Sequence, residues 1–395
     1  MNPADRPTRY PLAPLQQGML FHTLFAPRSG VDVEQLLCEL AEEVDAVALR
    51  RAWRRAAERH ALLRTSFRWE GLDEAVQEVS DAVEIPFLVE DWSGLPRSDA
   101  DAKLREYLRA ERRRGFEMDR APLMRLLLVR HAADRYSLAW TFHHALLDGR
   151  AMVLVLREVF ALYEAFAAGR ELELAPPLPY AAHVRWLRER DEDASGGFWR
   201  EVLRGFDTPA VLPQVRAARH AEAEYRETRL ALPRAGTAAL ATLAEAAGFT
   251  LNTVVQGAWA LLLARYTGLD DVAFGAVRSG RRSSVPGAGE IVGPFFNTVP
   301  VRVRVPAGAR LVPWLRELRA QHLAVRDHEH TPLARVQEWS QIPRDVPLFQ
   351  TLFSFERATM TDTLRAEGAA WRSRTLYPIR QPNFPINLSA WDGDE

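Results

Sequence analysis

Two adjacent histidines, His143 and His144, are followed by an aspartate and a glycine in the run FHHALLDG, residues 142–149. Imidazole exchanges protons near neutral pH, and a nearby carboxylate can orient it, so general acid–base chemistry is the first possibility. A shared metal ion is the second, but neighbouring residues at a strand end point to opposite faces and do not converge on one ion. We therefore favour an acid–base loop and expect no metal site.

The elements on either side must present this loop. Residues 135–142 alternate large apolar with small side chains, which is the period of a strand with one apolar face. A run that is apolar nearly all round follows at 151–168 and predicts a buried helix. In the simplest alternative, both histidines are core residues and Asp148 is only the polar start of that helix.

Composition removes several other kinds of chemistry. Lys103 is the single lysine and lies in a run that predicts an exposed helix, so we expect neither a P-loop nor a pyridoxal Schiff base. Cys38 is the only cysteine, which excludes an internal disulfide and a cysteine metal cluster. No G-x-S-x-G nucleophile elbow occurs. Covalent catalysis therefore lacks its usual candidates.

The overall charge and hydropathy indicate a soluble globular chain. The 395 residues are 47% apolar, enough for sizeable cores, and carry a net charge of −1 from 51 basic and 52 acidic residues. Such a balance creates no field that would attract nucleic acid or a membrane surface. No apolar run is long enough for a membrane span, and the first ten residues lack the apolar core of a signal peptide. We expect a cytoplasmic protein.

The pattern along the chain predicts two similar-sized α/β lobes. The prolines of Leu174–Tyr180 make the best linker, which places the boundary near residue 176. Before it we expect strands at 31–40, 62–69, 75–79 and 123–131, and a helix capped by Asp45 that ends near residue 61. After it we expect strands at 225–232, 272–277, 295–305 and 348–355, and helices at 235–247, 252–266 and 311–326.

The run HHxxxDG resembles the active-site signature of the condensation domains of nonribosomal peptide synthetases, within the chloramphenicol acetyltransferase-like superfamily. Other segments resemble further motifs of that family, in family order: YPLAPLQQGMLFH (10–22), RHALLRTSF (59–67), PYAAHVRW (179–186), IVGPFFNTVPVRV (291–303), HTPLARVQEWS (330–340) and LFQTLFSFE (348–356). Together these segments extend over nearly the whole chain.

This resemblance implies a fold and a reaction. The expected fold is α/β (α+β), with acetyltransferase-like lobes at 1–176 and 177–395 forming a V-shaped pseudo-dimer around a tunnel. Family members continue beyond the position of residue 395, so we expect a second lobe that is truncated at its C-terminus. The implied reaction is amide formation between substrates carried on the phosphopantetheine of donor and acceptor peptidyl carrier proteins. No cofactor of the domain's own is implied, and an adenylation domain is the expected neighbour.

The resemblance also assigns roles around the loop. His144 is the expected catalytic residue, acting either as a base toward the acceptor amine or as a group that orients it. Asp148 is expected in a structural ion pair with Arg64, with Arg281 as the second choice for its partner. His143 supports the loop from the core, and Gly149 allows a tight turn into the helix.

Three further residues are candidates for lining the tunnel: Asn297, Trp186 and Arg150. Asn297 lies inside a predicted strand, where β propensity disfavours it, so its amide either has a task or marks an edge or bulge. Trp186 is better explained by packing than by substrate contact. Arg150 follows DG at a position where an aromatic residue is frequent in the family, and it lies at the tunnel entrance or is simply exposed.

Rival functions differ in their motifs. The opening motif resembles variants that accept a D-configured donor or a starter acyl group. An epimerisation domain needs a glutamate-containing segment that 222–232 does not match, a heterocyclisation domain would carry DxxxxD, and a noncatalytic module usually loses the histidines. A stand-alone acyltransferase, which transfers an acyl group from a thioester to an alcohol or amine, remains the alternative because it uses the same residues.

Overall fold

A computed structural model describes residues 8–212, 226–356, 358–366, 368, 371–381 and 384–392. The chain divides into two compact units, each built from separate stretches of sequence. The first unit contains Met1–Glu189, Ser284–Phe295 and Met360–Gln381, and the second contains Arg190–Ser283, Phe296–Thr359 and Pro382–Glu395. In this division, two segments that come after residue 176, Ser284–Phe295 and Met360–Gln381, group with the first unit. The lobes 1–176 and 177–395 stay a prediction.

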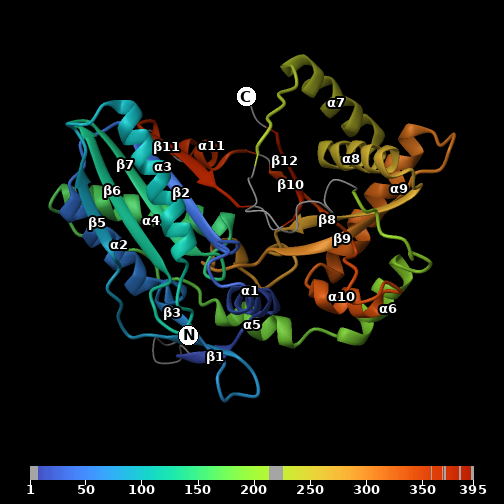
Figure 1. The fold of residues 1–395 in the computed structure, drawn as a ribbon, viewed down its shortest axis with the longest axis horizontal. Coiled ribbons are helices and arrows are strands. Elements are labelled where there is room, and N and C mark those ends of the chain that lie inside the picture. Colours follow the sequence, from blue (N-terminus) through green and yellow to red (C-terminus); the bar gives the residue numbers. More distant parts are fainter. Residues whose placement is uncertain are drawn as a thin grey trace. The chain divides into compact units, whose positions relative to one another are not determined.

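The first unit is built on a five-stranded sheet in the order β11-β2-β7-β6-β5 (Figure 1). A smaller sheet has the order β1-β4-β3. The elements of this unit are β1 (Arg9–Pro11), α1 (Pro14–Phe25), β2 (Val33–Leu40), α2 (Ala46–Arg59), η2 (Ala61–Arg64), β3 (Thr65–Arg68), β4 (Val76–Val79), β5 (Phe87–Asp91), α3 (Arg97–Arg114), β6 (Met124–Ala132), β7 (Arg135–His143), α4 (Gly149–Ala167), α5 (Ala181–Arg188), η4 (Ala288–Glu290), α11 (Met360–Arg365) and β11 (Arg374–Ile379).

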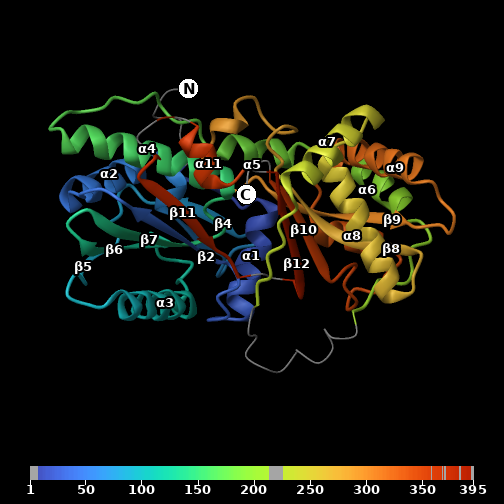
Figure 2. The same ribbon diagram turned by 90° about the horizontal axis from the view of Figure 1, so that it is seen from above.

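Helices cover both faces of this sheet, with α2 and α4 on one side and α3 on the other (Figure 2). Trp140 of β7 packs edge-on against Trp53 of α2, with ring centroids 4.8 Å apart. On the opposite face, Ala139 packs with Leu104 and Leu108 of α3. Both faces of β7 are therefore buried: one carries the large apolar side chains, and the small side chains of the other let α3 approach closely.

The second unit is built on a four-stranded sheet in the order β12-β10-β8-β9. Its core joins Phe274 and Phe353 of the sheet to Trp314. Its elements are α6 (Glu192–Val202), α7 (Arg234–Ala247), α8 (Leu251–Thr267), β8 (Asp271–Arg278), β9 (Asn297–Arg304), α9 (Leu311–Ala324), η5 (Val325–His328), α10 (Leu333–Trp339), β10 (Thr351–Glu356) and β12 (Ile386–Trp391).

Most of the expected elements are confirmed, with boundaries that move by a few residues. The expected N-cap of α2 is confirmed, since Asp45 Oδ1 accepts the amides of Val47 and Ala48 at 2.8 and 3.0 Å. The expected strand at 225–232 was wrong over its described part, 226–232, which carries no ladder and leaves Leu230 88% exposed.

One other expectation needs correction. The strand expected at 62–69 begins only at Thr65, because residues 61–64 form the 3-10 turn η2. Within its described residues, the region 357–395 supplies one strand to each large sheet. In that region β11 pairs antiparallel with β2, whereas β12 pairs parallel with β10.

Among the described helices, none is by itself long and apolar enough to cross a membrane. The bent pair α7–α8 passes such a test by length and composition when its two helices are joined across a 103° bend.

Candidate active site

The HHxxxDG loop connects β7, which ends at His143, to α4, which begins at Gly149. Asp148 is the N-cap of α4, and its Oδ1 accepts the amide of Ala151 at 2.8 Å. Its other oxygen, Oδ2, accepts the amide of Phe295 at 3.0 Å. The carboxylate is buried, so it both starts the helix and holds a segment that lies far along the chain.

The two expected partners of Asp148 lie in different units. Arg64 donates from Nε to the carbonyl oxygen of Ala57 at 2.9 Å, and from Nη1 to the carbonyl oxygens of Ser80 and Asp81. Arg281 belongs to the second unit, whereas Asp148 belongs to the first. The ion pair of Asp148 with either arginine stays a prediction.

His144 is half-buried, and its ring is oriented by its own loop. Its Nδ1 lies 2.8 Å from the carbonyl oxygen of Leu147. A carbonyl oxygen only accepts, so Nδ1 carries the proton and the neutral ring has its lone pair on Nε2. The backbone amide of His144 donates to the carbonyl oxygen of Asp32 at 2.8 Å. The loop thus sets both the position and the tautomer of this imidazole.

His143 is only 1% exposed and lies on the α3 face of the sheet, with its ring edge-on to Phe116. Its Nε2 lies 2.9 Å from Thr23 Oγ1, and its Nδ1 accepts the amide of Ala145 at 3.2 Å. Burial lowers the pKa of His143 to about 4, against the opposing charge of Asp32. The two imidazoles therefore have separate partners, and among the described residues no cluster could hold a metal ion.

Helix α1 supports the loop through residues that the sequence interpretation did not single out. Gln16 is fully buried, and its Nε2 donates to the carbonyl oxygen of Ala145 at 3.0 Å. Its Oε1 accepts the amide of Ala13 at 2.9 Å and an amide hydrogen of Gln77 at 3.0 Å. A glutamine in the first turn of a largely apolar helix was the available signal, but its partner lies 129 residues away.

Arg150 joins the start of α4 to the segment 288–290. Its Nε donates to the carbonyl oxygen of Gly289 at 3.1 Å, and its Nη2 pairs with Glu290 at 2.9 Å. Gly149 shows no positive φ, and an added Cβ would meet no described atom within 4 Å. The backbone at Gly149 therefore does not require glycine, contrary to the role expected for a tight turn.

The other two tunnel candidates have packing or backbone partners within their own units. Trp186 of α5 stacks on His183, which in turn stacks on Phe295. Asn297 begins β9, and its Nδ2 donates to the carbonyl oxygens of Glu329 and Thr331 at 2.9 and 2.6 Å. Both explanations for an asparagine in this strand therefore hold, because β9 is an edge strand of its sheet and the amide of Asn297 binds backbone. Substrate contact by Trp186, Asn297 and Arg150 stays a prediction.

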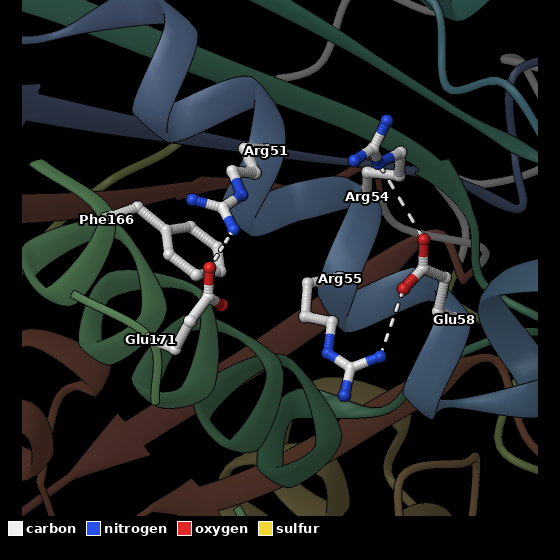
Figure 3. Close-up of a pocket in the computed structure, with 6 residues that line it drawn as sticks. All are labelled: Arg51, Arg54, Arg55, Glu58, Phe166 and Glu171. Atoms are coloured by element: carbon white, nitrogen blue, oxygen red, sulfur yellow. Dashed lines mark hydrogen bonds and ion pairs between the residues drawn. The ribbon is translucent and has the colours of Figure 1, made fainter. Parts of the chain in front are cut away.

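A surface hollow elsewhere in the first unit is lined by Arg51, Arg54, Arg55 and Glu58 of α2, together with Phe166 and Glu171 (Figure 3). Its arginines are already engaged: Arg51 pairs with Glu171, and Glu58 pairs with the other two. None of the lining residues belongs to the HHxxxDG loop, so this hollow is separate from the candidate active site.

Comparison with known proteins points to one family. The family model for the condensation domain matches residues 7–395. A linear gramicidin synthase of Brevibacillus parabrevis is 40% identical over 98% of this chain, which covers 5% of that protein. Bacitracin synthase 3 of Bacillus licheniformis is 34% identical over 96% of this chain, which covers 6% of that protein. The chain thus spans a small fraction of the length of these relatives.

Solved structures confirm the fold. The starter condensation domain of rhizomide synthetase has a TM-score of 0.76 at 18% identity, with coverage of 98% of this chain and 88% of that one. The X-domain from teicoplanin biosynthesis has a TM-score of 0.74 at 25% identity, with coverage of 98% and 85%. The expected chloramphenicol acetyltransferase-like fold class is confirmed by these neighbours.

Proposed function

Because the chain belongs to the condensation-domain family, we propose that it forms amide bonds between two substrates carried as thioesters by partner carrier proteins. The α-amine of the acceptor attacks the carbonyl carbon of the donor thioester. The new C–N bond forms as the C–S bond breaks, the amine loses a proton, and the phosphopantetheine thiol leaves with one. Thioesters are already reactive toward amines, so holding both ends together supplies much of the rate.

One observation carries the proposal: the tautomer of His144. Since the carbonyl of Leu147 accepts the Nδ1 proton, Nε2 is the atom that can accept a proton or a hydrogen bond from the acceptor amine. An α-ammonium group has a pKa of roughly 8 and an ordinary imidazole one of roughly 6.5, so transfer between such groups is feasible. Acting as a base and orienting the neutral amine both remain open roles for His144.

The remaining parts of the proposal follow the family. Asp148 pairs with Arg64 or Arg281, and its buried carboxylate supports a structural role. The tunnel between lobes 1–176 and 177–395 is lined by Asn297, Trp186 and Arg150. The partners are donor and acceptor peptidyl carrier proteins and an adjacent adenylation domain, which fits a chain whose relatives are much longer synthases. The domain itself binds no cofactor, and the reaction takes place in the cytoplasm.

For the donor we propose a D-configured residue or a starter acyl group. The opening motif at 10–22 supports this choice, because it resembles the variants that accept such donors. Competition between matched D-donor, L-donor and acyl-donor carrier proteins for one acceptor would decide it. Faster turnover of the L-donor would contradict the proposed donor class.

The first test replaces His144 with alanine. Wild type and His144→Ala are mixed with donor- and acceptor-loaded carrier proteins, and carrier-bound amide is followed by intact mass spectrometry. We expect product with wild type and a rate lower by roughly 10² or more in the variant, because the amine loses its proton acceptor or its orienting group.

His131→Ala is the matched control. His131 is an imidazole in β6, hydrogen-bonded to Ser137, at the end of the β6–β7 pair opposite His144. We expect this variant to keep the wild-type rate. An undiminished rate in His144→Ala would contradict the catalytic role. Turnover of a free alcohol or amine, with no carrier-bound amide from any donor, would instead indicate a stand-alone acyltransferase.

A further inference from the structure

Thr23, in the last turn of α1, touches the catalytic loop from a distance of 120 residues along the sequence. Its hydroxyl lies 2.9 Å from His143 Nε2 and 2.9 Å from the carbonyl oxygen of Met19. The carbonyl can only accept, so the single hydroxyl proton of Thr23 points to Met19. What Thr23 presents to His143 is therefore a lone pair, and Nε2 must carry a proton.

The other side of the His143 ring leads to the same conclusion independently. Its Nδ1 receives the backbone amide of Ala145, and an amide nitrogen only donates, so Nδ1 must carry a lone pair. Both contacts thus select the neutral ring with its proton on Nε2. Protonation of Nδ1 would set two donors against each other inside the core, which agrees with the lowered pKa of this buried group.

The loop residues that hydrogen-bond to His143 are neighbours of His144 in the chain. Ala145 is the next residue in the chain, and the carbonyl oxygen of His143 accepts the amide of Leu146. On the other side, the amide of His144 is bound by the carbonyl of Asp32, just before β2. A rotation of the His143 ring that releases Ala145 therefore removes one of the contacts that hold the turn with the His144 imidazole, beside those of Gln16 and Asp32.

We propose that Thr23 is a positioning residue for the amide-forming reaction: its hydroxyl accepts the Nε2 proton of His143 and so fixes the orientation of this ring, which helps to hold the turn that aims His144. Thr23 touches neither substrate nor the reacting atoms and acts only through His143. The catalytic part of this inference rests on the proposed function, whereas the tautomer of His143 can be measured without any substrate.

Helix α1 has a second contact with this end of the sheet, next to Thr23. His22 Nδ1 lies 3.6 Å from Oδ2 of the buried Asp32, and this nearby carboxylate raises the pKa of His22. His22 and Thr23 are consecutive, so the last turn of α1 is held both to the residue before β2 and to the end of β7. These contacts therefore hold the last turn of α1 where the hydroxyl of Thr23 meets Nε2 of His143.

The direct test is nuclear magnetic resonance of the wild-type chain labelled with ¹⁵N-histidine at pH 7. The two ring nitrogens of His143 are assigned through their coupling to its side-chain protons. We expect a protonated Nε2 and an unprotonated Nδ1. A proton on Nδ1 in the wild type would overturn the proposal without any variant.

Two substitutions then separate the hydroxyl from the shape of the side chain. Thr23→Val keeps the branched shape but removes the acceptor, whereas Thr23→Ser keeps the hydroxyl. We expect Thr23→Val to leave the Nε2 proton of the buried His143 without its acceptor, which changes the Nε2 signal, while the amide of Ala145 still keeps Nδ1 unprotonated. We expect kcat to fall roughly tenfold with KM for both carrier proteins unchanged, since only the aim of His144 is impaired. Thr23→Ser should keep the wild-type Nε2 signal and the wild-type kcat.

The possible results are distinguishable from one another. A Thr23→Val protein that folds and keeps both the wild-type Nε2 signal and kcat would overturn the proposal, as would a Thr23→Ser protein that behaves like the valine variant. If Thr23→Val does not fold, the wild-type spectrum and the serine variant still decide. Failure of the wild type to form amide from any donor would remove the proposed function, while the tautomer result would still stand or fall by itself.

Discussion

Asp148 joins two segments of backbone through one buried carboxylate. One oxygen caps α4 at the amide of Ala151, and the other holds the amide of Phe295. Loss of either contact leaves a buried amide donor without this acceptor, which is costly in the interior. A change at Asp148 therefore lowers stability by a route that does not involve the chemistry, and lost activity alone would not make it catalytic.

We predict that Asp148→Ala lowers the free energy of unfolding by about 1–3 kcal/mol or more. The matched control is Asp45→Ala at the N-cap of α2. This variant also loses its hydrogen bonds to two backbone amides, but in a more exposed setting. This control should cost about 0.5–2 kcal/mol and leave amide formation unchanged. Urea unfolding of both variants measures the difference, and a smaller loss for Asp148→Ala than for Asp45→Ala would contradict the explanation.

At the scale of the elements, the segment 284–295 links α5 and the start of α4 through its contacts within the first unit. Tyr180, just before α5, donates from its hydroxyl to the carbonyl oxygen of Pro294 at 2.8 Å, and its ring packs edge-on against Phe295. Gly293 lies directly beneath that ring, so an added Cβ would overlap Tyr180. Close packing of these two motif segments is what brings the amide of Phe295 to Asp148.

We predict that Gly293→Ala lowers the free energy of unfolding by about 1–3 kcal/mol, because the methyl group displaces the ring of Tyr180. Amide formation should fall as well, since the displaced segment carries Phe295. Gly289→Ala is the control in the same segment, where an added Cβ would meet no described atom within 4 Å. Thermal unfolding of the two variants tests this, and equal melting temperatures would show that the packing at Gly293 tolerates a methyl group.

Across the whole molecule, each unit buries a histidine that must stay neutral. Burial lowers the pKa of His143 in the first unit to about 4, and burial together with Arg278 and Arg319 lowers the pKa of His322 in the second to about 3. In the unfolded chain both rings bind a proton near pH 6.5. Between these values the unfolded state binds more protons, so the stability of the folded chain falls as pH falls below about 6.5.

We predict that lowering the pH from 7.5 to 5 costs about 2 kcal/mol for each of these two histidines. His22, whose pKa is raised by Asp32, acts in the opposite direction but is largely exposed, so its effect is smaller. Urea unfolding at several pH values measures the slope, and His322→Gln should reduce it. Stability that is constant over this range, or an unchanged slope in the variant, would contradict the linkage.

The sequence by itself determined the features that depend on neighbouring residues. Parity along β7 separated His143 from His144, because successive side chains of a strand alternate between its faces. Helix caps and helical periodicity also depend only on residues that are near in sequence. The sequence therefore predicted the cap at Asp45 and the helices near 235–247 and 252–266. The order of the motifs led to the family and to its fold class, which the solved neighbours confirm.

Only the tertiary structure decided which distant residues support the site. Thr23 and Gln16 reach the loop across 120 and 129 residues, and no local pattern records such a contact. The strand expected over 226–232 failed because a strand exists only where a partner completes its hydrogen bonds. Likewise, β11 and β12 are close in sequence but lie in different sheets, since pairing depends on which edge each strand meets in the folded chain.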